Sequence, residues 1–76
     1  MAEFRLQVPD ELLSKMQDKL GGNAKMTDIA RDALTLFNWA INEKARGRLI
    51  LSSAPDGDSI KQLAMTSLDA VKEEKP

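Results

Sequence analysis

Few residues of this 76-residue chain are suited to catalytic chemistry. The sequence has no cysteine and no histidine, so a thiolate zinc site is excluded, and the commonest general base and metal ligand are both missing. Its carboxylates are scattered over faces expected to lie in solvent, and we find no nucleophile–base pairing and no phosphate-binding glycine loop. The sequence therefore predicts a protein that is not an enzyme and that needs no metal ion or cofactor.

The polar groups that remain are best ordered near the N-terminus, where residues 3–8 alternate strictly between polar and apolar side chains. The polar face consists of Glu3, Arg5 and Gln7. The apolar face consists of Phe4, Leu6 and Val8. A period of two is typical of a half-buried strand.

This strand has no ladder partner within the first 47 residues, yet its backbone groups must pair somewhere. The simplest partner is the same strand of a second copy, which gives a two-fold symmetric, antiparallel ribbon.

Two amphipathic helices are expected after this strand. The first covers residues 9–20, with Pro9 at its start and Gly21 at its stop. The second begins with Thr27 as its N-cap and ends at Gly47. Its apolar stripe is wide enough to need partners on more than one side. We expect the dimer core to combine residues of this stripe with the apolar face of the strand: Leu34, Phe37 and Ile41 with Phe4, Leu6 and Val8.

The sequence is interpreted as a domain over residues 1–47 followed by a C-terminal extension over residues 48–76. Residues 49–51 form a short apolar run that is typical of a strand, and residues 54–57, Ala-Pro-Asp-Gly, predict a turn. The extension is expected to end in frayed acidic residues.

Residues 59–71 fit two interpretations. Apolar residues at helical spacing, together with Ser59 and Gln62 as a capping box, favour a helix. Alternatively, residues 59–65 fold back on residues 48–53 as a hairpin. The helix is the preferred interpretation, and the hairpin is kept as the alternative.

Length and hydropathy set further limits. A lone domain of this size buries only about 60–65% of its unfolded surface, and no disulfide reinforces it, so dimerisation is the expected source of stability. No apolar run approaches the roughly 18 residues that span a bilayer, and the N-terminus lacks the apolar core of a signal peptide. We therefore expect a cytoplasmic protein with no membrane partner.

Charge is the property least typical of a nucleic-acid-binding protein. Eleven basic and twelve acidic residues give a net charge of −1, whereas such proteins usually carry a basic excess. The acidity belongs mainly to the extension: residues 1–51 sum to +1 and residues 52–76 to −2. A local basic patch on the N-terminal part is compatible with this distribution.

Two segments resemble a known family. Phe-Arg-Leu-Gln-Val-Pro-Asp-Glu-Leu-Leu, residues 4–13, looks like the opening of ribbon-helix-helix repressors, the group that includes the Arc and methionine repressors. Thr-Asp-Ile-Ala-Arg-Asp-Ala-Leu, residues 27–34, resembles the start of the second helix in that family. The match covers about residues 3–47 and leaves the extension unexplained. It implies a mainly α-helical, intertwined homodimer with one short β-strand per chain, paired across the dimer as a ribbon.

The resemblance also implies which residues contact DNA. In this family the ribbon contacts base edges, and the start of the second helix binds the phosphate backbone. The base readers are then Arg5 and Gln7, with Glu3 at the edge. The phosphate contacts are Lys25, Met26, Thr27 and Asp28. In the major groove, Arg can bind guanine and Gln can bind adenine, each through two hydrogen bonds. N–H groups at the N-terminus of a helix bind anions. Glu3 and Asp28 are negatively charged, and in this respect they depart from an ideal phosphate-binding residue.

The leading functional hypothesis is a sequence-specific regulator of transcription, a repressor that binds double-stranded DNA as a homodimer. The alternative is a protein-interaction module whose residues 48–76 bind a partner protein, as antitoxins bind toxins. A third hypothesis is that the ribbon-helix-helix fold serves only for dimerisation. The acidic composition favours this third hypothesis.

Overall fold

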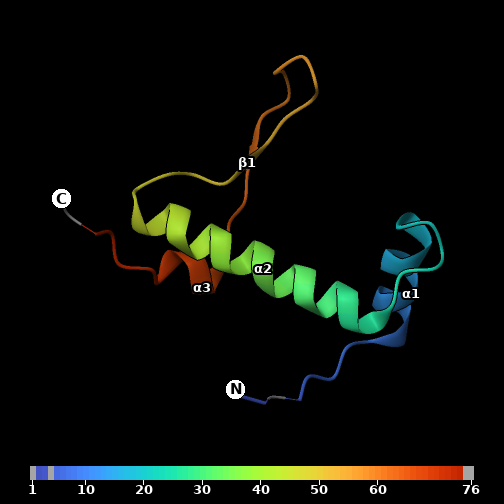
Figure 1. Ribbon diagram of the computed structural model, residues 1–76. Helices are drawn as coiled ribbons and strands as arrows, with labels where there is room; N and C mark the ends of the chain where they lie inside the picture. Colours follow the sequence, from blue (N-terminus) through green and yellow to red (C-terminus); the bar gives the residue numbers. More distant parts are fainter. Residues whose placement is uncertain (1, 4, 75–76) are drawn as a thin grey trace. The chain divides into compact units, whose positions relative to one another are not determined.

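The computed structural model describes residues 2, 3 and 5–74 (Figure 1). Contacts within the chain divide it into two compact units, Met1–Asp32 and Ala33–Pro76. The division falls inside the longest helix of the described chain, α2 (Met26–Ala45). The described chain is mainly helical, with one two-stranded antiparallel sheet.

The first unit contains α1 (Asp10–Lys19), which matches the helix expected over residues 9–20. Acidic residues lie in its first turn and Lys19 in its last, in the order that the helix dipole favours. Gly21, at φ 98°, donates to the carbonyl of Asp18, and Gly22 donates to the carbonyl of Gln17 at 2.8 Å. These two bonds form a Schellman motif. The glycine stop predicted for this helix is therefore confirmed.

The strand expected over residues 3–8 does not form in this chain. The described residues of that segment have no regular secondary structure, and Phe4 lies outside the described residues. A strand is defined by its ladder, and this segment finds no ladder partner among the described residues of its own chain. An intermolecular ribbon requires a second chain and stays a prediction.

The second helix begins earlier than expected. The carbonyl of Lys25 accepts the first bond of α2, from the N–H of Ile29 at 3.0 Å. Lys25 therefore occupies the N-cap position and Thr27 lies within the first turn, so the assignment of Thr27 as the N-cap is wrong. The chain enters the helix directly from the turn, and no side-chain cap at Thr27 is needed to start it.

The predicted glycine stop of α2 is confirmed. Gly47 has φ 78°, and its N–H donates to the carbonyl of Lys44 at 3.0 Å, while Arg48 donates to Glu43 at 3.0 Å. This is a second Schellman motif. The N–H of Glu74 donates to the carbonyl of Ala45 at 2.6 Å. The described end of the extension is thus bonded to the end of α2 and is not frayed there.

The second unit contains a hairpin of β1 (Leu51–Ser52) and β2 (Lys61–Gln62). Leu51 pairs with Gln62 and Ser52 with Lys61, and one further bond joins Leu63 to Ile50 at 2.8 Å. Strand-like residues near position 50 and the turn after them were expected, and both are confirmed.

The helix preferred for residues 59–71 is wrong over its first half, and the alternative hairpin is confirmed. The Pro55-Asp56-Gly57 turn reverses the chain: Gly57 has φ 89°, and its N–H donates to the carbonyl of Ala54 at 2.9 Å. Ser59 has φ 58°, which is incompatible with the extended backbone of a helix N-cap. The helix is confined to α3 (Thr66–Asp69).

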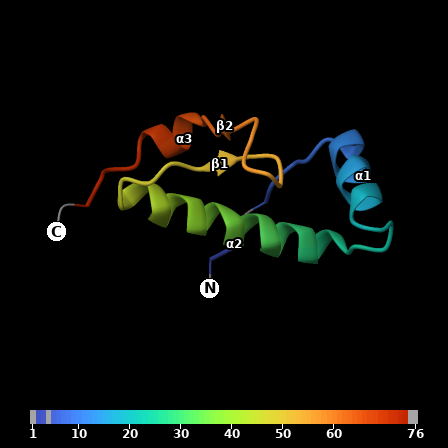
Figure 2. The same ribbon diagram turned by 90° about the horizontal axis from the view of Figure 1, so that it is seen from above.

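Helix α3 runs beside the C-terminal half of α2 (Figure 2). Ala40 of α2 and Leu68 of α3 are the buried residues of the described chain, with 4% and 2% of their surfaces exposed. The core of the second unit is therefore very small. None of the helices in the described chain has both the length and the apolar character needed to cross a membrane.

Candidate nucleic-acid interface

The residues expected to read bases lie in the exposed segment before α1. Glu3, Arg5 and Gln7 are all exposed, and no hydrogen bond or ion pair joins residues 5–8 to another described residue outside the segment. Gln7 also lines an open hollow of about 560 Å³ at the start of α1, together with residues 8–10. These polar side chains are free to contact a ligand.

The apolar side chains of the same segment are not buried by this chain. Leu6 is 73% exposed and Val8 is 40% exposed. Full burial of such a side chain contributes about 1.5–3 kcal/mol. The segment therefore leaves a substantial hydrophobic free energy unused in the single chain.

The residues expected to contact phosphate lie together at the start of α2. Lys25 is at the N-cap position, and Met26, Thr27 and Asp28 form the first turn. All four are exposed. The N–H groups of a first helical turn have no partner within the helix and lie at the positive end of its dipole. Lys25 adds a formal positive charge to this helix end.

Asp28 works against anion binding at the same helix end. Its Oδ1 lies 3.6 Å from Nη1 of Arg31, and both side chains are largely exposed. The carboxylate stabilises the helix N-terminus by itself, but it also repels a phosphate. The ion pair with Arg31 offsets part of that negative charge. Lys25 and the backbone N–H groups therefore favour an anion at this helix end, whereas Asp28 disfavours one.

Gln17 was missed by the sequence reasoning. Its side-chain Nε2 donates to the carbonyl of Ala24 at 3.2 Å, and its own carbonyl accepts from Gly22. These two bonds hold the turn that immediately precedes Lys25. A glutamine in the last turn before a glycine pair carries no sequence signal for such a contact, so only the structure could identify it.

The structure brings the expected phosphate contacts together at the start of α2. Within the described part of the chain, no hydrogen bond or ion pair joins the base readers Arg5 and Gln7 to Lys25 or Asp28.

The α2 residues expected in a dimer core lie in the second unit. Leu34 is 52% exposed, while Phe37 and Ile41 are half-buried. This stripe is thus incompletely covered within one chain.

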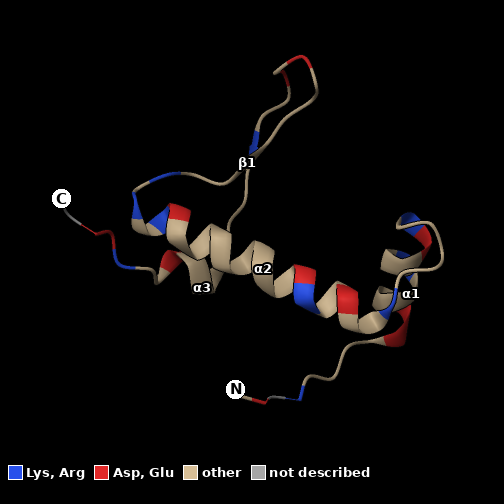
Figure 3. Cartoon of the chain, viewed as in Figure 1, with Lys and Arg blue, Asp and Glu red and all other residues tan. Residues whose placement is uncertain are grey.

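Basic residues at the C-terminal end of α2 are a less suitable DNA contact. Nε of Arg48 lies 3.2 Å from Oε2 of Glu43, whose side chain is only 16% exposed. Figure 3 shows acidic and basic residues mixed at this end of α2, which is also the negative end of the helix dipole. Arg48 therefore serves to hold the chain as it leaves the helix.

Comparisons with models of known protein families, with curated proteins and with solved structures found no match.

Proposed function

We propose that this chain is a sequence-specific DNA-binding regulator, a repressor that acts as a ribbon-helix-helix homodimer. One observation carries the proposal. An exposed segment of alternating polar and apolar residues, with no hydrogen bond or ion pair to the rest of the described chain, directly precedes two helices joined by a tight glycine turn. Pairing with the same segment of a second copy would satisfy its backbone groups and bury Leu6 and Val8.

Such a ribbon places polar side chains on its outer face. Arg5 and Gln7 from both chains would then enter the major groove, where a two-stranded ribbon fits. Lys25 and the first N–H groups of α2 would bind the flanking phosphates. Because it acts on DNA inside a cell, the proposed regulator would be cytoplasmic.

The proposal is tested by selecting bound sequences from random duplex DNA with the full chain. The selected DNA and a random duplex are then titrated over a range of salt concentrations. Specific binding to a two-fold symmetric or repeated site is expected, with affinity that falls as salt increases. Absence of binding to any duplex at about 50 mM salt, where electrostatic attraction is strong, would overturn the proposal.

The alternative function, a tail that binds a toxin-like partner, is less well supported. A tail that folds only on a partner has few contacts with its own chain. Among the described residues, Leu68 of the extension is the most deeply buried, and the extension is hydrogen-bonded to the end of α2. Deletion of residues 52–76 is therefore expected to unfold the second unit, and not merely to release a partner.

A further inference from the structure

The turn of the hairpin contains two neighbouring residues that can react with each other. Asp56 is the only aspartate or asparagine of this sequence that is followed by a glycine, Gly57. A side-chain carboxyl group in this position is open to attack by the main-chain nitrogen of the next residue, and glycine hinders that attack least because it has no side chain. Both residues are exposed, and a Cβ built at Gly57 would meet nothing within 4 Å. Crowding by the described chain therefore does not block the reaction.

The hydrogen bonds of the turn engage both reacting groups. Oδ1 of Asp56 accepts from the N–H of Asp58 at 3.0 Å. The N–H of Gly57 donates to the carbonyl of Ala54 at 2.9 Å, and the N–H of Ala54 donates to the carbonyl of Asp58 at 2.8 Å. The carboxyl group and the nitrogen that would attack it are thus each bonded to a different partner. The reaction requires that these bonds open first.

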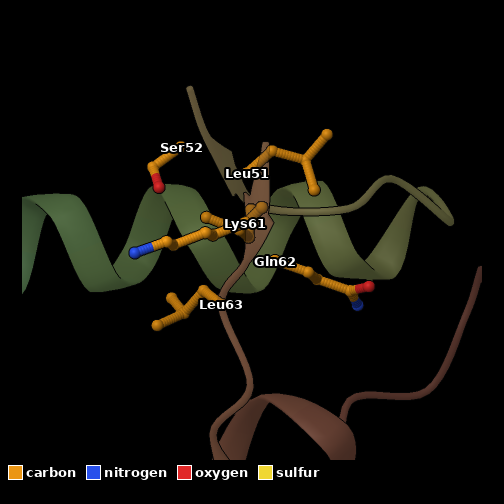
Figure 4. Close-up of a pocket in the computed structure, with 6 residues that line it drawn as sticks. Leu51, Ser52, Lys61, Gln62 and Leu63 are labelled. Carbon is orange, nitrogen blue, oxygen red and sulfur yellow. The ribbon is translucent and has the colours of Figure 1, made fainter. Parts of the chain in front are cut away.

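The hairpin has little packing that would keep the turn closed. Both residues of β1 and both residues of β2 are exposed, and a hollow of about 350 Å³ lies against the two strands (Figure 4). Figure 1 shows the tip of the hairpin standing clear of α2. Segments with few buried apolar contacts open locally at a small fraction of the free energy of global unfolding. We therefore expect the turn to open while α2 and α3 stay folded.

We propose that Asp56–Gly57 is a site of spontaneous modification, at which aspartate rearranges to isoaspartate at a rate set by opening of the turn. The nitrogen of Gly57 forms a bond to Cγ of Asp56. One water leaves, made of the hydroxyl of the protonated carboxyl group and the proton of the N–H, and a cyclic succinimide remains. Water then adds to one of the two ring carbonyls. Addition at Cγ restores aspartate, and addition at the main-chain carbonyl leaves Gly57 joined to the side chain of Asp56.

This modification changes the hairpin itself. Isoaspartate adds one carbon to the main chain at the centre of the turn, so the bonds between Ala54 and residues 57 and 58 no longer fit. The N–H of Leu63 donates to the carbonyl of Ile50 at 2.8 Å, and its hydrogen exchange should become faster in the modified chain. The inference goes beyond the proposed function, because it requires neither DNA nor a second chain.

The test compares the full chain folded in buffer with the same chain unfolded in guanidinium chloride, both incubated at neutral pH and physiological temperature. Isoaspartate is measured in the tryptic peptide of residues 49–61 by chromatography, and electron-transfer fragmentation locates it. It should form at Asp56 in both samples, several-fold more slowly in the folded chain. Asp58, which precedes Ser59, is the internal control and should react more slowly than Asp56 in guanidinium chloride. An equal or faster rate in the folded chain, or no isoaspartate at Asp56 in the unfolded chain, would overturn the proposal.

Two variants test the role of the turn. Pro55→Gly removes the ring that fixes the backbone before Asp56, so the rate in the folded chain should rise several-fold, while the rate in guanidinium chloride should change little. Asp56→Glu keeps the carboxylate but places it one carbon farther away, so no product should form and the exchange of Leu63 should stay constant during incubation. Circular dichroism confirms that Pro55→Gly remains folded, and the wild-type comparison decides the matter if it does not. An unchanged rate in folded Pro55→Gly would show that the turn does not restrain the reaction and would overturn the proposal.

Discussion

The side-chain amide of Gln17 donates a hydrogen bond to the carbonyl of Ala24, at 3.2 Å, and so joins the last turn of α1 to the residue before Lys25. The main-chain carbonyl of Gln17 also accepts from Gly22 at 2.8 Å. One residue therefore holds both ends of the turn between the helices. Because α2 begins directly after this turn, Gln17 positions the helix end at which we place the phosphate contact.

Replacing Gln17 by alanine tests this relationship. Gln17→Ala should lower the free energy of unfolding by about 0.5–1.5 kcal/mol, because one partly buried hydrogen bond is removed. Urea unfolding measures the change. Lys15→Ala is the control, since it removes only an exposed pair with Glu11 that contributes about 0.5 kcal/mol or less. Equal unfolding midpoints for the two variants would show that the bond from Gln17 is not stabilising.

The two glycine stops differ in their surroundings, which gives a second prediction. Gly47 and Gly21 both have positive φ, but a Cβ at Gly47 would collide with the side chain of Glu73, whereas a Cβ at Gly21 meets nothing within 4 Å. Both Gly→Ala changes should cost about 1 kcal/mol for the left-handed backbone, and the two costs should be similar, because the atoms of Glu73 nearest Gly47 are the far end of a flexible, exposed side chain that can move aside.

Thermal or urea unfolding of the two variants measures both costs. In a Glu73→Ala background, the cost of Gly47→Ala should be unchanged, because the side chain that moves aside is simply absent. A cost of Gly47→Ala that falls in that background would show that Glu73 cannot move away from a Cβ at Gly47.

Local sequence signals were sufficient to predict α1 and α2. The Gly21-Gly22 and Gly47 stops are confirmed because glycine reaches positive φ without strain, which is a property of the residue and not of its context. The predicted start of α2 was wrong, because the first residue of this helix depends on how the preceding turn is held. The hydrogen bond from Gln17 that holds this turn is not visible in the sequence.

The extension shows why the secondary structure of residues 59–71 could not be predicted from local sequence signals. Apolar residues between positions 60 and 71 have helical spacing, but the turn at Gly57 brings residues 61–63 beside residues 50–52, and ladder hydrogen bonds decide the outcome. The prediction of the candidate site from the sequence has a similar limit. Its residue types were visible in the sequence, but a ribbon between two chains depends on a partner that no single chain contains.

Assembly through the N-terminal segment gives a third prediction. Leu6→Asp should abolish the ribbon and leave the chain largely unfolded, because a charge would enter the shared core. Gln7→Asp, on the polar face of the same segment, should retain assembly. Sedimentation and circular dichroism at micromolar concentration measure both variants. Unchanged assembly in Leu6→Asp would exclude the segment from the dimer.

The base-reading face gives a fourth prediction. Arg5→Ala and Gln7→Ala should preserve the dimer, and each should weaken specific binding by about 1–3 kcal/mol for every bidentate pair of hydrogen bonds to a base that it removes. A two-fold dimer carries each such pair twice, so the effect over a full site is up to double that. Each variant should also relax base preference at one position, as measured by repeating the selection. Unchanged selection by both variants would show that the groove-reading face has been misassigned.

Lys25 should behave differently from the base readers, because a phosphate contact carries no sequence information. Lys25→Ala should weaken binding to selected and random duplexes alike, and it should reduce the slope of log affinity against log salt by about one for each phosphate bound. The control is Lys19→Ala, which removes the same charge from the exposed last turn of α1. Salt titrations of the wild type and both variants give the slopes. If Lys19→Ala lowers the slope as much as Lys25→Ala does, the effect is one of net charge, and the start of α2 is not a phosphate site.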